Sequence, residues 1–96
     1  MELTLLARAY CHLCDDMLAA LAPRAAARGA SVTVIDVDAP GCEGLEAEWG
    51  ERVPVLFAGP PDPGNEVCHF HLDSDRVEAA FAGRLPPRVA PEAEIR

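Results

Sequence analysis

Two cysteines three residues apart, Cys11 and Cys14, are the residues of this 96-residue chain whose type and spacing most directly suggest chemistry. A C-x-x-C pair can form a reversible disulfide, supply half of a metal site, or pack as two small buried side chains. Zinc needs four nitrogen or sulfur ligands, and no second close pair is present. The remaining candidate ligands are Cys42, Cys68, His69 and His71. The spacing favours redox chemistry and leaves metal or cluster binding and a structural pair as alternatives.

The residues after the pair predict a helix over 14–28, which is rich in good helix formers. A cysteine at the start of a helix lies near unpaired backbone N–H groups and the positive end of the helix dipole. Both stabilise the thiolate and lower the thiol pKa from about 8.5. Cys11 is therefore the predicted nucleophile, and Cys14, one turn further on, is the predicted resolving cysteine. A protonated His12 would stabilise the thiolate further, whereas the two aspartates after the pair would oppose it.

The rest of the chain alternates strands and helices. The predicted strands are residues 2–8, 31–38, 53–59 and 65–70, and the predicted helices are 14–28, 42–50 and 73–84. Pro23 conflicts with the first helix and is predicted to kink or split it. The proline-rich turn at 60–64 predicts an antiparallel pair of strands around it.

The order βαβαββα predicts an α/β domain. A right-handed crossover makes the first two strands parallel, and a mixed four-stranded sheet with helices on both faces follows. Trp49 is predicted to pack the second helix against this sheet, and Cys68 to pack as a small hydrophobic residue. We expect one domain over residues 1–84 and a loose tail over 85–96, where prolines are frequent and large apolar residues are few.

Three stretches of the sequence, "YCHLC", "VIDVD" and "RVPVLF", occur in the same order relative to these elements as in a known fold. The chain resembles the small bacterial glutaredoxin-like proteins of the thioredoxin-fold superfamily. The resemblance implies a thiol–disulfide oxidoreductase whose catalytic residues are Cys11 and Cys14. It also implies that the Val53–Pro54 bond is cis and lies against the pair, whereas a trans proline that merely begins a strand is the alternative. The substrate-binding residues implied are Tyr10, His12, Leu13, Arg52, Val53 and Pro54.

The sequence departs from glutathione-dependent relatives at two places. Arg52 replaces the usual threonine before Val-Pro, and His71-Leu72 replaces a pair of glycines that would allow close backbone approach to a ligand. Arg8 and Arg52 remain candidate partners for the carboxylates of glutathione. We therefore predict no cofactor and no metal, and we do not assign glutathione as the reductant. The expected partners are a disulfide-containing protein or small thiol substrate and an unidentified thiol reductant.

Charge and hydropathy exclude other classes of function. The net charge is −8, and all eight basic residues are arginine, which argues against binding to nucleic acid. No window of 18 apolar residues is present, so no membrane segment is predicted. The N-terminal residues lack the features of a signal peptide, and we expect a cytoplasmic protein. The rival to an enzyme is a binding module that keeps the fold and the pair without turnover.

Overall fold

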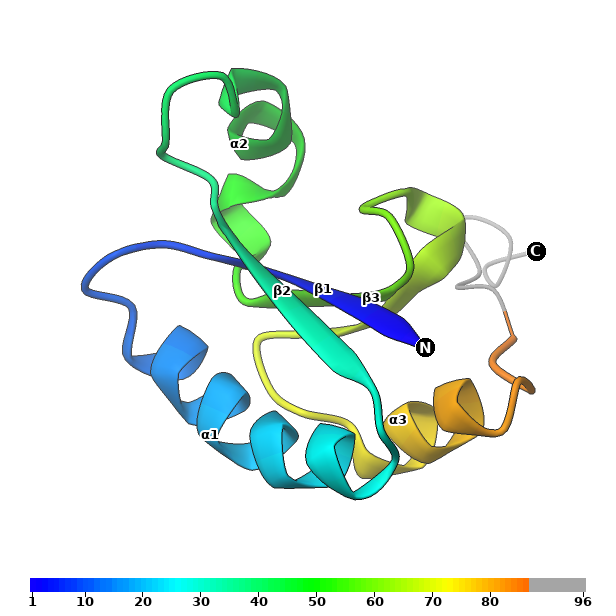
Figure 1. Cartoon of the computed structure of the whole chain (residues 1–96). Helices are drawn as coiled ribbons and strands as arrows, with labels where there is room; N and C mark the ends of the chain where they lie inside the picture. The colour runs from blue at the N-terminus through cyan, green and yellow to red at the C-terminus, as the bar shows by residue number, and fades with distance from the viewer. Residues whose placement is uncertain (87–96) are drawn as a thin grey trace, which may run out of the picture.

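The computed structural model describes residues 1–86 and has the predicted order of elements (Figure 1). The strands are β1 (Glu2–Ala7), β2 (Ser31–Asp36), β3 (Val55–Ala58) and β4 (Glu66–His69). The helices are α1 (His12–Ala27), α2 (Glu43–Trp49) and α3 (Ser74–Phe81), with short 3₁₀ turns η1 (Gly50–Arg52) and η2 (Pro63–Asn65). The α/β class and the order βαβαββα are confirmed.

The four strands form one mixed sheet in the order β2-β1-β3-β4. β1 pairs parallel with β2 and antiparallel with β3, and β3 pairs antiparallel with β4. The crossover from β1 to β2 runs through α1, whereas the short connection between β3 and β4 contains only η2. The sheet therefore has two edges, β2 and β4.

Helices cover both faces of the sheet, and each face has its own buried cluster. In Figure 1, α1 and α3 lie on one side of the strands and α2 lies on the other. The cluster on the α1 and α3 side comprises Leu3, Leu5, Met17, Leu21, Ala25, Leu56, Val67, Cys68, Val77 and Ala80. The cluster on the α2 side comprises Leu6, Cys14, Val37, Trp49, Val53, Val55 and Phe57. Trp49 meets Phe57 edge-on, with ring centroids 5.0 Å apart, so α2 is packed on the sheet as predicted.

Several elements are shorter than predicted: β2 ends at Asp36 rather than 38, and α3 ends at Phe81 rather than 84. Two strand starts also differ near prolines. β3 begins at Val55 rather than residue 53, after the Val53–Pro54 bond, and β4 begins only after the 3₁₀ turn that starts at Pro63. Pro23 was predicted to kink or split the first helix. It does not split the helix, because α1 continues through Pro23 as one element. Leu21 and Ala25, on either side of Pro23, are buried and hold both halves of α1 against the sheet.

The last described residues run past α3. Leu85 packs against the cluster on the α1 and α3 side, and the Pro86 carbonyl accepts a hydrogen bond from Arg76 at 3.2 Å. The predicted loose tail lies, from residue 87 onward, outside the described residues. Among residues 1–86, none of the helices has the length and apolar character needed to cross a membrane.

Candidate active site

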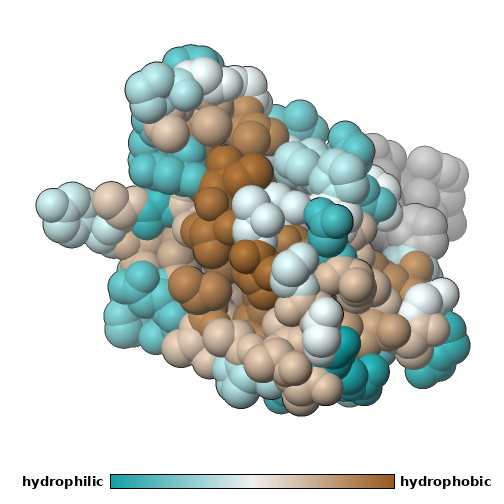
Figure 2. Space-filling model, in the orientation of Figure 1, coloured by the Kyte–Doolittle hydropathy of each residue, from teal (hydrophilic) through white to brown (hydrophobic). Residues whose placement is uncertain are grey.

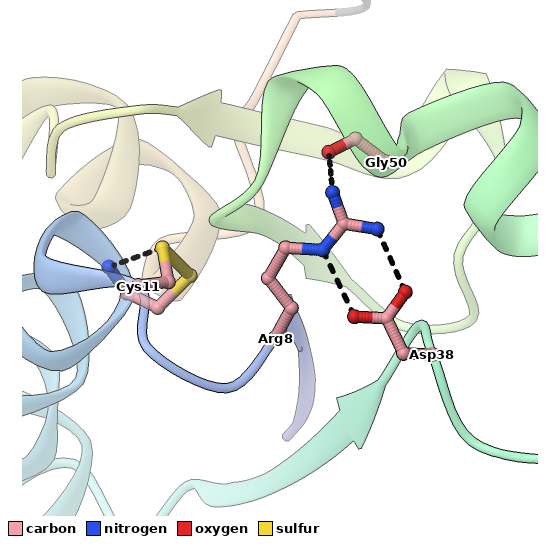
Figure 3. The surroundings of a disulfide bond; sticks show 5 residues. Arg8, Cys11, Asp38 and Gly50 are labelled. Atoms are coloured by element: carbon pink, nitrogen blue, oxygen red, sulfur yellow. Dashed lines mark hydrogen bonds and ion pairs between the residues drawn. A yellow bond between two sulfur atoms is a disulfide. The ribbon is translucent and has the colours of Figure 1, made fainter.

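Cys11 and Cys14 form a disulfide at the start of α1, with their Cα atoms 5.2 Å apart. Cys11 has extended backbone angles and is the N-cap of the helix. Its Sγ accepts a hydrogen bond from the backbone N–H of Cys14 at 3.1 Å (Figure 3). The sulfur thus takes the place that a serine or aspartate oxygen usually occupies at a helix N-terminus. The same N–H group would stabilise a thiolate at Cys11 after reduction.

The two sulfurs differ in access. Cys14 is only 3% exposed and belongs to the buried cluster on the α2 side, whereas Cys11 is partly exposed and packs at the margin of that cluster. A substrate can therefore approach Cys11 but not Cys14 without displacing packed residues. An attacking cysteine must be accessible to substrate and a resolving cysteine need not be, so this asymmetry is consistent with the predicted roles of Cys11 and Cys14.

Val53 and Pro54 follow η1 and are both buried. The peptide bond between them is cis. Val53 belongs to the same buried cluster as Cys14, so the fold brings the two sequence-distant parts of the predicted site together. The Pro54 carbonyl accepts a hydrogen bond from the N–H of Phe70 at 2.9 Å, which ties this segment to the end of β4.

Tyr10, His12 and Leu13 surround Cys11 in the turn that starts α1. Tyr10 is fully exposed and has a positive φ of 57°, so its ring projects into solvent beside the disulfide. His12 is exposed, and its Nε2 lies 3.2 Å from a carboxylate oxygen of Asp16. Leu13 is partly exposed. The structure thus leaves these three neighbours of Cys11 in the chain exposed or partly exposed, and their predicted role in substrate binding stays a prediction.

Arg52 is directed toward α2. Its guanidinium lies 4.4 Å from the centre of the Trp49 ring and donates a hydrogen bond to the Glu48 carbonyl at 2.7 Å. Both contacts hold the side chain on the helix that precedes it in the chain. Neither contact places Arg52 at the disulfide. Its role in substrate binding stays a prediction.

Arg8 forms a network that sequence reasoning missed (Figure 3). Its guanidinium binds Asp38 through two hydrogen bonds at 3.1 and 2.8 Å, Glu46 at 3.2 Å and the Gly50 carbonyl at 3.1 Å. The hydrogen bonds to Asp38 and then to Glu46 raise the pKa of Arg8 above its ordinary value. From the sequence, Arg8 was expected only as a candidate partner for the carboxylates of glutathione. The sequence did contain a signal for this network: Arg8 directly follows the first strand, and Asp38 follows the parallel second strand.

Gly50 lies where this network closes. A Cβ there would lie 2.7 Å from a Glu46 carboxylate oxygen, closer than real Cβ atoms approach. A side chain at this position would therefore displace Glu46 or the turn that carries Arg52. The Arg8 network thus joins the end of β1, the loop after β2 and the turn leading to Val53.

The predicted alternative ligands are scattered. Cys68 is buried, as predicted for a small hydrophobic residue, and Cys42 is the partly exposed N-cap of α2. The ring Nδ1 of His69 lies 2.6 Å from a carboxylate oxygen of Glu66, and His71 lies beyond the end of β4. Within residues 1–86, no three His, Cys, Asp or Glu side chains are grouped so that they could hold a metal ion.

Comparisons with known proteins agree with this geometry. The family model described as Glutaredoxin-like domain (DUF836) matches residues 2–82. Uncharacterized proteins of Mycobacterium tuberculosis (Rv0508) and Mycobacterium bovis (Mb0520) are each 33% identical over 84 residues, which covers 84% of this chain and 82% of each relative. Protein Ne2328 from Nitrosomonas europaea, solved by solution NMR, is 40% identical and superposes with a TM-score of 0.68 over 81% of this chain and 87% of that one.

The family match covers the whole sheet, the three helices and the C-x-x-C pair. The solved relative adds the same fold at substantial sequence identity. The resemblance to small glutaredoxin-like proteins of the thioredoxin fold is therefore confirmed, and the chain belongs to the glutaredoxin-like domain (DUF836) family.

Proposed function

We propose that this protein is a thiol–disulfide oxidoreductase in which Cys11 is the nucleophile and Cys14 the resolving cysteine. The observation that carries the proposal is the unequal placement of the two sulfurs at one helix N-terminus. Cys11 Sγ is partly exposed and accepts a backbone hydrogen bond, whereas Cys14 is buried one turn below it. Membership of the glutaredoxin-like family supports the same chemistry.

The reaction proceeds by two exchanges. The Cys11 thiolate attacks one sulfur of a substrate disulfide, a Cys11–substrate bond forms, and the other substrate sulfur leaves as a thiolate that takes a proton from water. The Cys14 thiolate then attacks Cys11 Sγ, the Cys11–Cys14 bond forms, and the second substrate thiolate leaves and is protonated. The substrate gains two electrons and two protons. A dithiol, or two monothiols, returns the protein to its reduced state by the same exchange in reverse.

The proposed substrate groove runs between the α1 turn and the Val53–Pro54 segment. Tyr10, His12 and Leu13 form its exposed rim beside Cys11, and Val53 and Pro54 form its wall. In this proposal an extended segment of the substrate lies along the backbone of Val53, which places its disulfide over Cys11. Arg52 lies at the end of the proposed groove nearest α2.

Glutathione is the less favoured reductant. Arg8 and Arg52 were the candidate partners for the carboxylates of glutathione. Arg8 already binds Asp38, Glu46 and the Gly50 carbonyl, and Arg52 is held on α2. Beyond β4, Asp73 accepts a hydrogen bond from the N–H of Arg76 at 3.2 Å as the N-cap of α3. The proposed electron donor is therefore a dithiol protein or a small thiol other than glutathione.

The test is reduction of insulin disulfides by the protein, with dithiothreitol as electron donor. Cys11→Ser should abolish the acceleration over dithiothreitol alone, since no other thiol replaces the attacking sulfur. Cys14→Ser, reduced and then freed of dithiothreitol before insulin is added, should form a mixed disulfide between Cys11 and insulin that mass spectrometry identifies. Cys42→Ser is the matched control, because Cys42 is also a partly exposed N-cap cysteine but makes no side-chain capping hydrogen bond.

Full activity in Cys11→Ser would contradict the proposal. Absence of activity in the unsubstituted protein, with both cysteines reduced and accessible to alkylation, would also contradict it. That second result would favour a binding module that keeps the fold without turnover.

A further inference from the structure

Within residues 1–86, β2 is an edge strand of the sheet. In that part of the chain it pairs with β1, and no further strand or helix pairs with its outer side. The N–H of Ser31 donates to the Met1 carbonyl at 3.0 Å, and donors alternate along a parallel ladder, so the backbone N–H and C=O groups of Val32 and Val34 point away from β1. An unpaired strand edge is a template for another strand unless charges, prolines or another element cover it.

Two large apolar side chains beside this edge are exposed. Val34 is 48% exposed and Leu18, on α1, is 36% exposed. Figure 2 shows an apolar band that runs between α1 and α2 on the side where β2 lies in front of β1 in Figure 1. Exposed apolar surface of this kind is typical of an interaction site when polar residues border it.

A pocket of about 240 Å³ opens beside this edge, between α1, β1 and β2. Leu5, Ala7, Cys14 and Leu18 contribute its apolar lining. Leu5 is opposite Val34 in the parallel register, so Val34 and the pocket lie on the same face of the sheet. The pocket is therefore continuous with the open strand edge, and the buried Cys14 forms part of its wall.

The polar residues of the pocket give it a negative character. Asp15 and Asp36 line it and are both exposed. Arg8 also lines it, but its charge is already balanced by Asp38 and Glu46. A side chain with an aliphatic stem and a cationic end, lysine or arginine, suits an apolar pocket with carboxylates at its margin.

We propose that the open edge of β2 and this pocket bind an extended segment of a partner protein that carries a lysine or arginine flanked by β-branched residues. The segment adds to the sheet as a fifth strand next to Val32 and Val34. Its basic side chain, opposite Val34, enters the pocket toward Asp15 and Asp36, and its flanking side chains cover the other face near Ile35. A second copy of the chain is disfavoured because each copy carries a net charge of −8.

The probe is the peptide acetyl-Thr-Val-Lys-Val-Thr-amide, titrated into the oxidised, isotope-labelled protein and followed by amide and methyl NMR shifts. Its matched partner carries glutamate in place of lysine. The lysine peptide should shift the signals of Val32, Val34, Asp36 and Leu18 and bind about tenfold more tightly than the glutamate peptide. The experiment needs no turnover, so its outcome is independent of whether the proposed oxidoreductase activity is correct.

The double variant Asp15→Asn with Asp36→Asn should weaken binding of the lysine peptide about fivefold. Asparagine at position 36 keeps the acceptor for the N–H of Asp38, so the local fold is preserved. The control is Asp62→Asn with Asp75→Asn, two exposed carboxylates that do not line the pocket. It should leave binding unchanged. Leu18→Ser, a second surface variant, should also reduce binding, because it removes apolar lining from the pocket without adding a charge.

Equal affinity for the two peptides would overturn the proposal, as would shifts centred on Val53 and Pro54. No shift at millimolar peptide would overturn it too. A dimer in sedimentation whose dissociation on dilution moves the β2 signals would assign the edge to a second copy instead.

Discussion

The two edge strands of the sheet are finished in different ways. On β4, Glu66, Val67 and Cys68 are all buried, and the side chain of Arg76 from α3 donates hydrogen bonds to the carbonyls of Glu66 and Val67. On β2, every residue is exposed or only partly buried. One edge is thus closed by the helix that follows it in the chain, and the other is left open beside the disulfide.

The buried edge strand, β4, contributes to the stability of the fold, and the exposed edge strand, β2, is the one proposed to bind a partner. Val67 and Cys68 of β4 belong to the larger buried cluster, whereas the loop after β2 is joined to the end of β1 by the ion pair between Arg8 and Asp38. Elements with few buried contacts are the ones that bind and adapt at low energetic cost. If the proposed thiol–disulfide exchange and the proposed docking are correct, the open edge next to Cys11 and Cys14 is where a partner binds.

The largest expected effect comes from one substitution made on each edge. Val67→Ala removes two methyl groups from a fully buried site and should lower the free energy of unfolding by about 2.5 kcal/mol. Val34→Ala, at a side chain that is 48% exposed, should lower it by less than about 1 kcal/mol. Urea unfolding of both variants measures the two changes in the free energy of unfolding. Equal losses would mean that the two edges carry equal packing and would break the comparison.

A smaller effect should follow removal of the cover from β4. Arg76→Met keeps most of the side-chain volume but loses the hydrogen bonds to the Glu66, Val67 and Pro86 carbonyls. We expect a loss of about 1.5 kcal/mol, because buried carbonyls are left without a charged donor. Arg84→Met, at an exposed arginine after α3, is the control. A loss no larger than that of the control would show that Arg76 does not close the edge.

The smallest expected effect is a pH dependence at Glu43, the first residue of α2. The Glu43 carboxylate accepts hydrogen bonds from its own N–H and from that of Gly41, which lower its pKa below the ordinary glutamate value. The folded state therefore favours the ionised form. This stabilisation is present at neutral pH and is lost as the pH falls through the lowered pKa.

Glu43→Gln keeps an acceptor but loses the charge, so its stability deficit relative to the unsubstituted protein should shrink as the solution is acidified. Urea unfolding at pH 7 and at pH values below the glutamate range measures this change. Glu48→Gln, in the same helix, serves as control. A deficit that stays constant with pH would contradict the assignment.

The sequence was sufficient for the order of elements, since each strand and helix has the expected periodicity and the turns contain proline or glycine. It was less reliable at the bounds of β3 and β4, where Pro54 and Pro63 delay the start of each strand. It was wrong about a split at Pro23, because the packing of Leu21 and Ala25 outweighs the loss of one helical hydrogen bond. Local propensity gives way to tertiary packing at such positions.

For the candidate site, the C-x-x-C spacing predicted Cys11 at the helix N-terminus and Cys14 one turn inside, because that geometry is local. The Arg8 network was not predictable in the same way, since it joins residues up to 42 positions apart. Neither was the open edge of β2, because the alternating apolar residues of 31–36 look the same in a covered strand and in an exposed one. Which edge is covered depends on where α3 lies.

The most direct test of the proposed function equilibrates the metal-free protein in graded thiol–disulfide buffers, alkylates the free thiols and maps the linkages by mass spectrometry. We predict a reversible two-electron transition with a single midpoint, in which Cys11–Cys14 is the disulfide that forms and Cys42 and Cys68 remain alkylated throughout. Failure of the Cys11–Cys14 disulfide to form, or pairing mainly through Cys42 or Cys68, would contradict the assignment of this pair as the redox centre.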